Sequence, residues 1–262
     1  MSYGRTVLGA VAVAAAVAGA SSAASAATIA ALQDGKSILW IDIGKMKVTG
    51  STKLAGGASL VGIDVRPANG KLYGVTGDGV IVTVDHKSGK WEKRSQITEK
   101  LPASATFSVD FNPAADRLRV LSSSGMSLRI NVDDGKTIVD GSLKYADADT
   151  NKGKQPRVTA GAYSNSFAGT KETSLYDFDI GNKAYVRQAP PNDGVLNTLS
   201  KLSLASPIAF DIWSDGKGGN TGWALSGGTL YMVDIATGAA TAKGKIAGLK
   251  GGISDIAIVP AM

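Results

Sequence analysis

The chain has 262 residues, a formal net charge of +6 and 19% charged residues. This length accommodates one large all-β domain or two ordinary domains. The sequence contains no cysteine, which excludes disulfides and a lipid-modified cysteine anchor. It is rich in glycine, with 33 residues, and poor in aromatic residues. Together with many Val, Thr and Ser residues, this composition favours short strands joined by tight turns.

The first 26 residues differ from the rest of the chain. Arg5 is their only charged residue, residues 7–20 are apolar, and small residues lead up to Ala26. This pattern is typical of a secretory signal peptide. The apolar run is shorter than the roughly 20 residues that a membrane-spanning helix needs. We therefore expect cleavage after Ala26 and a single mature domain over 27–262. We place that domain in the periplasm or the medium, with no membrane insertion.

Two short units alternate along the remaining sequence. The first unit begins a strand, with markers at Asp64, Asp110, Gly161, Asp211 and Asp255, where glycine replaces the aspartate in one degenerate copy. The second unit ends a strand before a turn, with markers at Asp42, Asp85, Asp133, Asp179 and Asp234. The spacing within each pair leaves room for strand, turn and further strands. Five alternating pairs predict a repeat architecture of five blades.

The two ends of the sequence carry complementary parts of one repeat. The last first-unit marker, Asp255, lies near the C-terminus, and its second-unit partner, Asp42, lies near the N-terminus. Two β-sandwiches or an open solenoid would also contain short strands but would not predict complementary ends. We therefore predict an all-β fold, a five-bladed β-propeller closed by its two ends. We expect residues 253–260 to pair with the strand that contains residues 38–43.

Four segments carry a resemblance to a known family: "FSVDFNPAADRLRVLSSSGMSLRINVDDG", "PRVTAGAYSNS", "TSLYDFDIG" and "QAPPNDGVLNTLSKL". With these, essentially the whole mature chain resembles exported bacterial proteins catalogued as domain of unknown function 4394. The resemblance implies secretion and a repeated architecture, and it brings no established activity or ligand. The family's Gly-Asp-x-Asn is Ala148-Asp149-Thr150-Asn151 in this chain, and the missing glycine weakens the case for a functional turn there.

One polar loop has the spacing of a metal site. Asp147, Asp149 and Asn151 stand at alternate positions, as do the first three ligands of a calcium loop. Lys152 replaces the turn glycine and Val158 replaces the bidentate glutamate of an EF-hand. We retain these three residues as the candidate metal ligands. A hydrogen-bonded, solvated loop is the alternative, and no other cofactor is indicated.

Two further segments are candidates for ligand binding. Arg117, Arg119 and Arg129 alternate with apolar residues, so they would share one face of a hairpin, either as an anion-binding patch or as a plain solvated face. Asn192 and Asp193 follow two prolines that fix an exposed turn. The remaining basic residues are widely spread, and with an export signal we expect no nucleic-acid partner.

Catalytic chemistry has little support in the sequence. The repeated aspartates Asp64, Asp110, Asp211 and Asp255 are expected to organise the turns of their blades, with a carboxylate active site as the alternative. His86 is the only histidine, which argues against a catalytic triad and against common zinc or copper sites.

Function is expected where the repeat is interrupted. The longest segments between a second-unit marker and the next first unit follow Asp133 and Asp179. We expect these segments to form loops on one face of the ring, with residues 214–222 on the other. The sequence thus predicts an exported, non-enzymatic propeller that binds a protein, a glycan or a small anion through loops on one face. The alternative is a carbohydrate-active hydrolase with carboxylates near the channel and calcium.

Overall fold

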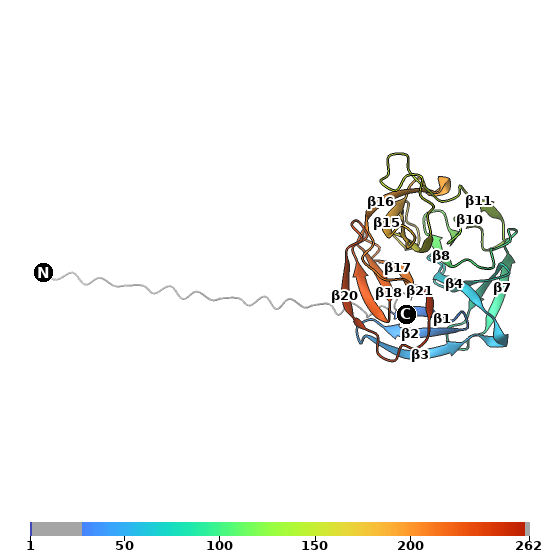
Figure 1. Cartoon of the computed structure of the whole chain (residues 1–262). Coiled ribbons are helices and arrows are strands. Elements are labelled where there is room, and N and C mark those ends of the chain that lie inside the picture. Colours follow the sequence, from blue (N-terminus) through green and yellow to red (C-terminus); the bar gives the residue numbers. More distant parts are fainter. Residues whose placement is uncertain (2–27, 260–262) are drawn as a thin grey trace.

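The computed structural model describes residue 1 and residues 28–259. Five small sheets in this region are arranged as the blades of a β-propeller around a central axis (Figure 1). The predicted all-β, five-bladed fold is therefore confirmed. The predicted cleavage site lies outside the described residues. Within the described part of the chain, no helix has the length and apolar character needed to cross a membrane.

Each blade is an antiparallel sheet whose strands follow one another from the axis outward. Blade 1 contains β21 (Ile253–Val259), β1 (Thr28–Gln33), β2 (Ser37–Asp42) and β3 (Lys47–Lys53). Blade 2 contains β4 (Leu60–Val65), β5 (Leu72–Thr76), β6 (Val80–Val84) and β7 (Trp91–Gln96). Blade 3 contains β8 (Phe107–Asn112), β9 (Arg117–Ser122), β10 (Ser127–Ile130) and β11 (Thr137–Val139).

Blade 4 differs from the others by an additional short strand. It contains β13 (Val158–Tyr163), β14 (Leu175–Asp179), β15 (Ala184–Gln188) and β16 (Val195–Lys201), and β12 (Lys144–Tyr145) pairs in parallel with β16. Blade 5 contains β17 (Ile208–Ser214), β18 (Asn220–Ser226), β19 (Thr229–Val233) and β20 (Ala240–Lys245). Two short 3₁₀ helices, η1 (Ala55–Gly57) and η2 (Pro191–Asp193), occur in connections.

Strands from both ends of the chain close the ring in blade 1. β21 pairs antiparallel with β1, with Thr28 opposite Val259. Closure through the N-terminal blade is thus confirmed, but the expected partner strand was wrong. The strand that contains Ile38 is β2, and it pairs with β1 on the side away from β21. The reason is that β1 is a central strand whose residues Ile29 to Leu32 are fully buried, so it separates β2 from the axis.

The hydrophobic core lies between adjacent blades. Side chains alternate along each inner strand, so each sheet contacts one neighbour with one face and the other neighbour with the opposite face. Between blades 2 and 3, for example, the rings of Tyr73 and Phe111 meet edge to face with their centroids 5.3 Å apart, among Val75, Val109 and Val120. This packing makes the inner strands a rigid support for the side chains around the axis.

The order of strands defines two faces of the ring. We call the face at which the innermost strands begin the start face, and the face at which they end the end face. Turns between the first and second strands of a blade, and between the third and fourth, lie on the end face. Residues 189–194 join β15 to β16, and residues 215–219 join β17 to β18, so both turns lie on the end face.

The expectation that these two turns lie on opposite faces was therefore wrong. Its cause is that Asp179 ends the second strand of blade 4 rather than the third. The long segment after Asp179 consequently contains the strands β15 and β16, and the connection from β16 to β17 is short. Within residues 28–259, only the segment before β13 is a long connection between blades. It leads to the start face, so the expectation that it shares one face with residues 189–194 was also wrong.

Candidate functional site

The repeated aspartates lie around the central axis and connect neighbouring blades. Each accepts a hydrogen bond from a backbone N–H of the next innermost strand: Asp64 from Phe111 (2.7 Å), Asp110 from Tyr163 (2.9 Å), Asp211 from Ile258 (2.5 Å) and Asp255 from Ile63 (3.0 Å). The sequence suggested a structural role in the turns of their own blades. The structure instead assigns them contacts across blade interfaces.

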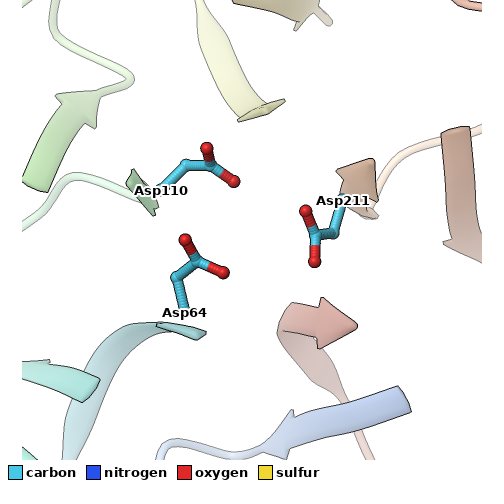
Figure 2. Close-up of side chains that lie close together, drawn as sticks. All are labelled: Asp64, Asp110 and Asp211. Atoms are coloured by element: carbon cyan, nitrogen blue, oxygen red, sulfur yellow. The ribbon is translucent and has the colours of Figure 1, made fainter. Parts of the chain in front are cut away.

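Three of these carboxylates converge on the axis. Asp64, Asp110 and Asp211 each offer an oxygen atom, and these oxygens lie within 4.8 Å of one another (Figure 2). All three side chains are buried. Burial, followed by repulsion from neighbouring aspartates, raises the pKa of Asp64 and of Asp110 well above the usual range. Burial also raises the pKa of Asp211, to about 6. The cluster therefore favours protons or cations over free negative charge.

Blade 4 lacks an axial aspartate. Gly161, the degenerate marker, pairs with Asp177 of β14, and a Cβ atom at position 161 would overlap the Asp177 carboxylate. Ala160 and Ala162 pack towards blade 5. Because side chains alternate along a strand, position 161 faces blade 3 instead.

Asp177 is an isolated buried carboxylate. Its side chain is fully buried, and neither oxygen has a hydrogen-bond partner among the described residues. Burial raises the pKa of Asp177 to about 8, although the charge of Arg119 opposes the shift. This group was not among the predicted site residues.

A cavity lies at each face of the ring. At the end face, a cavity of about 290 Å³ is lined by Asp64 and Asp211 together with Trp213, Phe167 and Asp215. No lysine, arginine or histidine lines this mouth. At the start face, a cavity of about 470 Å³ is lined by the first residues of the innermost strands. Two of the three clustered aspartates therefore line the end-face cavity, and none of them lines the start-face cavity.

A larger cleft of about 1150 Å³ lies between blades 1 and 2. Trp40 of β2 and His86 of the turn after β6 line it, and their rings meet edge to face with centroids 5.8 Å apart. Thr52 fixes both residues, because its hydroxyl accepts a hydrogen bond from Trp40 Nε1 (2.9 Å) and donates one to the His86 carbonyl (2.8 Å). The exposed charged side chains around the cleft are Lys71, Asp85, Lys87, Lys90 and Glu92.

The turn that carries His86 has a defined local structure. Asp85 Oδ1 accepts a hydrogen bond from the Ser88 backbone N–H at 2.7 Å, and Gly89 adopts a positive φ of 67°. A side chain at Gly89 would also overlap the Lys53 carbonyl of blade 1, so glycine permits close contact between the blades. Sequence reasoning missed this cleft, because it is formed by segments that come together only through the packing of two blades.

The predicted arginine patch is an internal ion-pair network. Arg119 is 2% exposed and lies 2.6 Å from Asp140, while Arg129 contacts the other Asp140 oxygen at 2.9 Å. Arg119 also donates to Asn192 Oδ1 at 3.0 Å, so two predicted binding segments do meet. Asp140 compensates one of the two positive charges and accepts hydrogen bonds from both guanidinium groups, so this geometry does not favour an anion-binding patch.

The other two predicted binding residues are more exposed. Arg117 donates hydrogen bonds to the carbonyl oxygens of Ala115 and Asp116. Asp193 lies beside Asn192 in the turn between β15 and β16, and its side chain is exposed. Ligand binding by either residue stays a prediction.

The candidate calcium loop lies against β16. Asp149 accepts hydrogen bonds from the backbone N–H (2.5 Å) and the hydroxyl (2.8 Å) of Thr198, and Asn151 donates to the same hydroxyl at 3.1 Å. Asp147 instead points into solvent, where it pairs with Lys152 at 3.1 Å. The structure brings Asp149 and Asn151 together without Asp147. These contacts favour a hydrogen-bonded loop, and metal binding there stays a prediction.

Most of the chain matches a known protein family. A family model described as domain of unknown function (DUF4394) matches residues 39–257. The chain belongs to the DUF4394 family. The DUF4394 match includes the four axial aspartates and both aromatic residues of the cleft, whereas β1 precedes it. No match was found among curated proteins.

Several solved structures are similar to this DUF4394 protein at low sequence identity. A structural genomics protein of unknown function from Bacteroides thetaiotaomicron VPI-5482 is 15% identical, with a TM-score of 0.57 over 90% of this chain and 64% of that one. A protein of unknown function from Bacteroides caccae is 13% identical, with a TM-score of 0.46 over 83% and 72%. An auxiliary nutrient binding protein from Bacteroides thetaiotaomicron VPI-5482 is 12% identical, with a TM-score of 0.47 over 81% and 57%.

In two of these three comparisons the DUF4394 chain spans less than two thirds of the matched chain. At these identities the similarity concerns the fold alone.

Proposed function

We propose that this DUF4394 protein is an exported, non-enzymatic binding protein that holds a small anionic saccharide in the cleft between blades 1 and 2. The observation that carries the proposal is the combination of a rigid aromatic pair and several lysines in one large cleft. Trp40 and His86 supply the aromatic pair. Ligand pockets commonly combine such apolar surfaces with a few fixed polar groups.

The aromatic pair suits the apolar face of a sugar ring. Trp40 is half-buried, and its indole N–H is already bonded to Thr52, so the ring is held in one orientation. A rigid aromatic side chain offers a large contact area at little entropic cost when a ligand binds. The hydroxyl groups of a saccharide would then meet polar cleft residues such as Ser51.

The charges around the cleft favour an acidic ligand. Lys71, Lys87 and Lys90 line it, and the exposed acidic residues Asp85 and Glu92 oppose them. Asp85 also lines the cleft, but its carboxylate accepts backbone and hydroxyl hydrogen bonds within its own turn. Three lysines against Asp85 and Glu92 leave the lining with a net positive charge, which attracts anions.

The hydrolase alternative has weaker geometric support. A glycoside hydrolase needs two carboxyl groups with access to the bond between them. The axial carboxylates are 4–5% exposed and accept hydrogen bonds from backbone N–H groups. These contacts serve blade assembly, so binding is the function that we prefer.

Ligand screening tests the proposal directly. The mature chain would be titrated with uronic-acid oligosaccharides and with their neutral counterparts, and binding would be measured by calorimetry. We expect acidic oligosaccharides to bind better, and we expect Trp40→Ala to weaken binding at least about tenfold, equivalent to about 1.4 kcal/mol. Lys71→Ala combined with Lys87→Ala should reduce the preference for the acidic ligand.

Two controls separate binding from folding. Trp213→Ala removes an exposed tryptophan outside the cleft and should leave binding unchanged. Trp40→Phe should retain part of the affinity, which shows that loss in the alanine variant does not reflect unfolding. Equal binding by wild type and Trp40→Ala, or no binding of any acidic oligosaccharide, would contradict the proposal.

A further inference from the structure

We propose that Asp64, Asp110 and Asp211 hold one calcium ion on the axis of the propeller, reached from the end face. This site is separate from the saccharide cleft, and its proposal does not rest on saccharide binding. It is also separate from the loop that contains Asp149, which lies against β16 at the outside of blade 4.

The spacing of the three carboxylates fits the size of calcium. Their oxygens lie within 4.8 Å of one another and come from β4, β8 and β17. Calcium binds oxygen at 2.3–2.6 Å, so two ligands on opposite sides of the ion are separated by at most about 5 Å. Magnesium binds oxygen at 2.0–2.1 Å, and the corresponding limit is about 4.2 Å. Magnesium also demands near-ideal octahedral geometry and usually keeps several waters, whereas calcium accepts an irregular set of carboxylate oxygens. Three carboxylates that backbone N–H groups hold in place therefore favour calcium.

One carboxylate of the cluster has an oxygen that accepts no hydrogen bond from the described residues. Asp110 Oδ1 accepts the Tyr163 N–H, whereas Oδ2 has no hydrogen-bond partner among the described residues, although the side chain is only 5% exposed. Figure 2 shows this carboxylate pointing towards Asp64 and Asp211. Both oxygens of Asp64 and of Asp211 accept backbone hydrogen bonds. The free oxygen of Asp110 is thus a ligand atom without a protein partner.

The hydrogen bonds of the other two carboxylates do not prevent coordination. A carboxylate has about four lone-pair sites, so an oxygen that accepts one N–H can also bind a cation. These N–H groups fix the carboxylates in place, which lowers the cost of organising the site. Waters from the end-face mouth would complete the 6–8 oxygen ligands that calcium takes.

No basic side chain compensates the cluster. None of the three aspartates forms an ion pair with a lysine, arginine or histidine among the described residues. Three buried carboxylates without a counter-charge repel one another and lose hydration. A divalent cation on the axis would remove both penalties at once.

A route to the site exists at the end face. Asp64 and Asp211 line the cavity of about 290 Å³. Ser214 and the exposed Asp215 line it as well. Its lining contains no basic residue, so the potential at this mouth attracts cations.

Calcium titration of the chelator-treated mature chain tests the inference. We expect one calcium ion per chain by calorimetry, and a rise in melting temperature of about 5–10 °C at a calcium concentration 100 times the Kd. Magnesium should give a smaller rise at equal concentration. No calcium-dependent rise at millimolar calcium, or an equal response to magnesium, would overturn the inference.

The variant Asp110→Asn separates coordination from structure. Its Oδ1 can still accept the Tyr163 N–H, but it replaces the free carboxylate oxygen with an amide. Without calcium, we expect this variant to melt no lower than the wild type, because one repelling charge is gone. With calcium, its affinity should fall at least about tenfold. A variant that binds calcium as tightly as the wild type would contradict the proposed site.

The outer loop provides the matched control. The double substitution Asp147→Asn and Asp149→Asn removes two carboxylates from the loop and leaves the axis unchanged. We expect its calcium affinity to equal that of the wild type. Loss of calcium binding in the loop variant, with retention in Asp110→Asn, would move the site from the axis to the loop and refute the inference.

Discussion

The guanidinium of Arg119 lies 2.6 Å from the carboxylate of Asp140, and the two side chains are only 2% and 4% exposed. Asp140 also pairs with Arg129, and Arg119 also bonds Tyr163, Ser127 and Asn192. This network joins blade 3 to the turn between β15 and β16 of blade 4. Its members are therefore coupled across a blade interface.

Removing Asp140 should destabilise the domain strongly. Asp140→Ala leaves the buried Arg119 charge without its partner, and we expect the free energy of unfolding to fall by about 3–5 kcal/mol. Urea denaturation measures the change. Asp147→Ala is the control, since its ion pair with Lys152 is exposed and should contribute at most about 1 kcal/mol. Similar effects from both substitutions would contradict the role assigned to Asp140.

Asp177 should make stability depend on pH. Its pKa is raised from 3.8 to about 8 in the folded state, so the folded protein binds its proton more tightly than the unfolded chain. This contribution is fully present below about pH 4 and is lost as pH rises through 8. Within that window the slope approaches about 1.4 kcal/mol per pH unit.

Comparison with Asp177→Asn isolates this effect. The variant carries no titrating group at the position, so its stability should fall less steeply between pH 4.5 and 8.5 in the presence of chelator. Denaturation curves of both proteins across this range measure the difference. Parallel pH profiles would show that Asp177 has an ordinary pKa.

Gly161 and Asp177 should be energetically coupled. Gly161→Ala introduces a Cβ into the space of the Asp177 carboxylate, and such overpacking costs about 1–3 kcal/mol. In an Asp177→Ala background the same substitution should cost less, because the overlapping atoms are absent. A double-mutant cycle measures the coupling. Additive effects would indicate that the two residues do not share this space.

Strand β21 should be essential for the whole ring. Deleting residues 252–262 removes the partner of β1 and the Asp255 contact to Ile63, and it leaves both neighbouring blades without an inner packing partner. We expect loss of the cooperative thermal transition. A synthetic peptide of residues 252–262 should restore that transition when added to the truncated protein. A truncated protein that melts like the wild type would refute this dependence.

The repeat markers were sufficient to predict the number of blades and their closure. Aspartates at fixed positions recur because four of the five innermost strands make the same contact to their neighbour, as Asp64 and Asp255 show. Such a requirement leaves a visible period in the sequence. The order of strands within blade 1 was harder to predict from the sequence. Both β1 and β2 are apolar, and only packing decides which lies nearer the axis.

The site was less predictable than the fold. Asp179 matches the second unit but ends β14, so counting residues after it misplaced the turn that holds Asn192. The cleft of Trp40 and His86 and the convergence of Asp64 with Asp211 depend on contacts between blades distant in sequence. No local pattern encodes such contacts. Arg119 of β9 likewise pairs with Asp140, which follows β11 two strands away, so the sequence pattern did not reveal the ion pairs of the arginine patch.

The antiparallel pairing of β1 with β21 gives the ring a direction of mechanical weakness. Thr28 and Val259 are partners at one end of this pair, so tension applied between them acts on the outermost hydrogen bonds first. Hydrogen bonds in an antiparallel ladder run perpendicular to the strands. Tension between Thr28 and Val259 would therefore break these bonds sequentially rather than all at once. We therefore expect the protein to yield to small forces when pulled at these two residues, although the same ladder holds the ring closed against heat and denaturant.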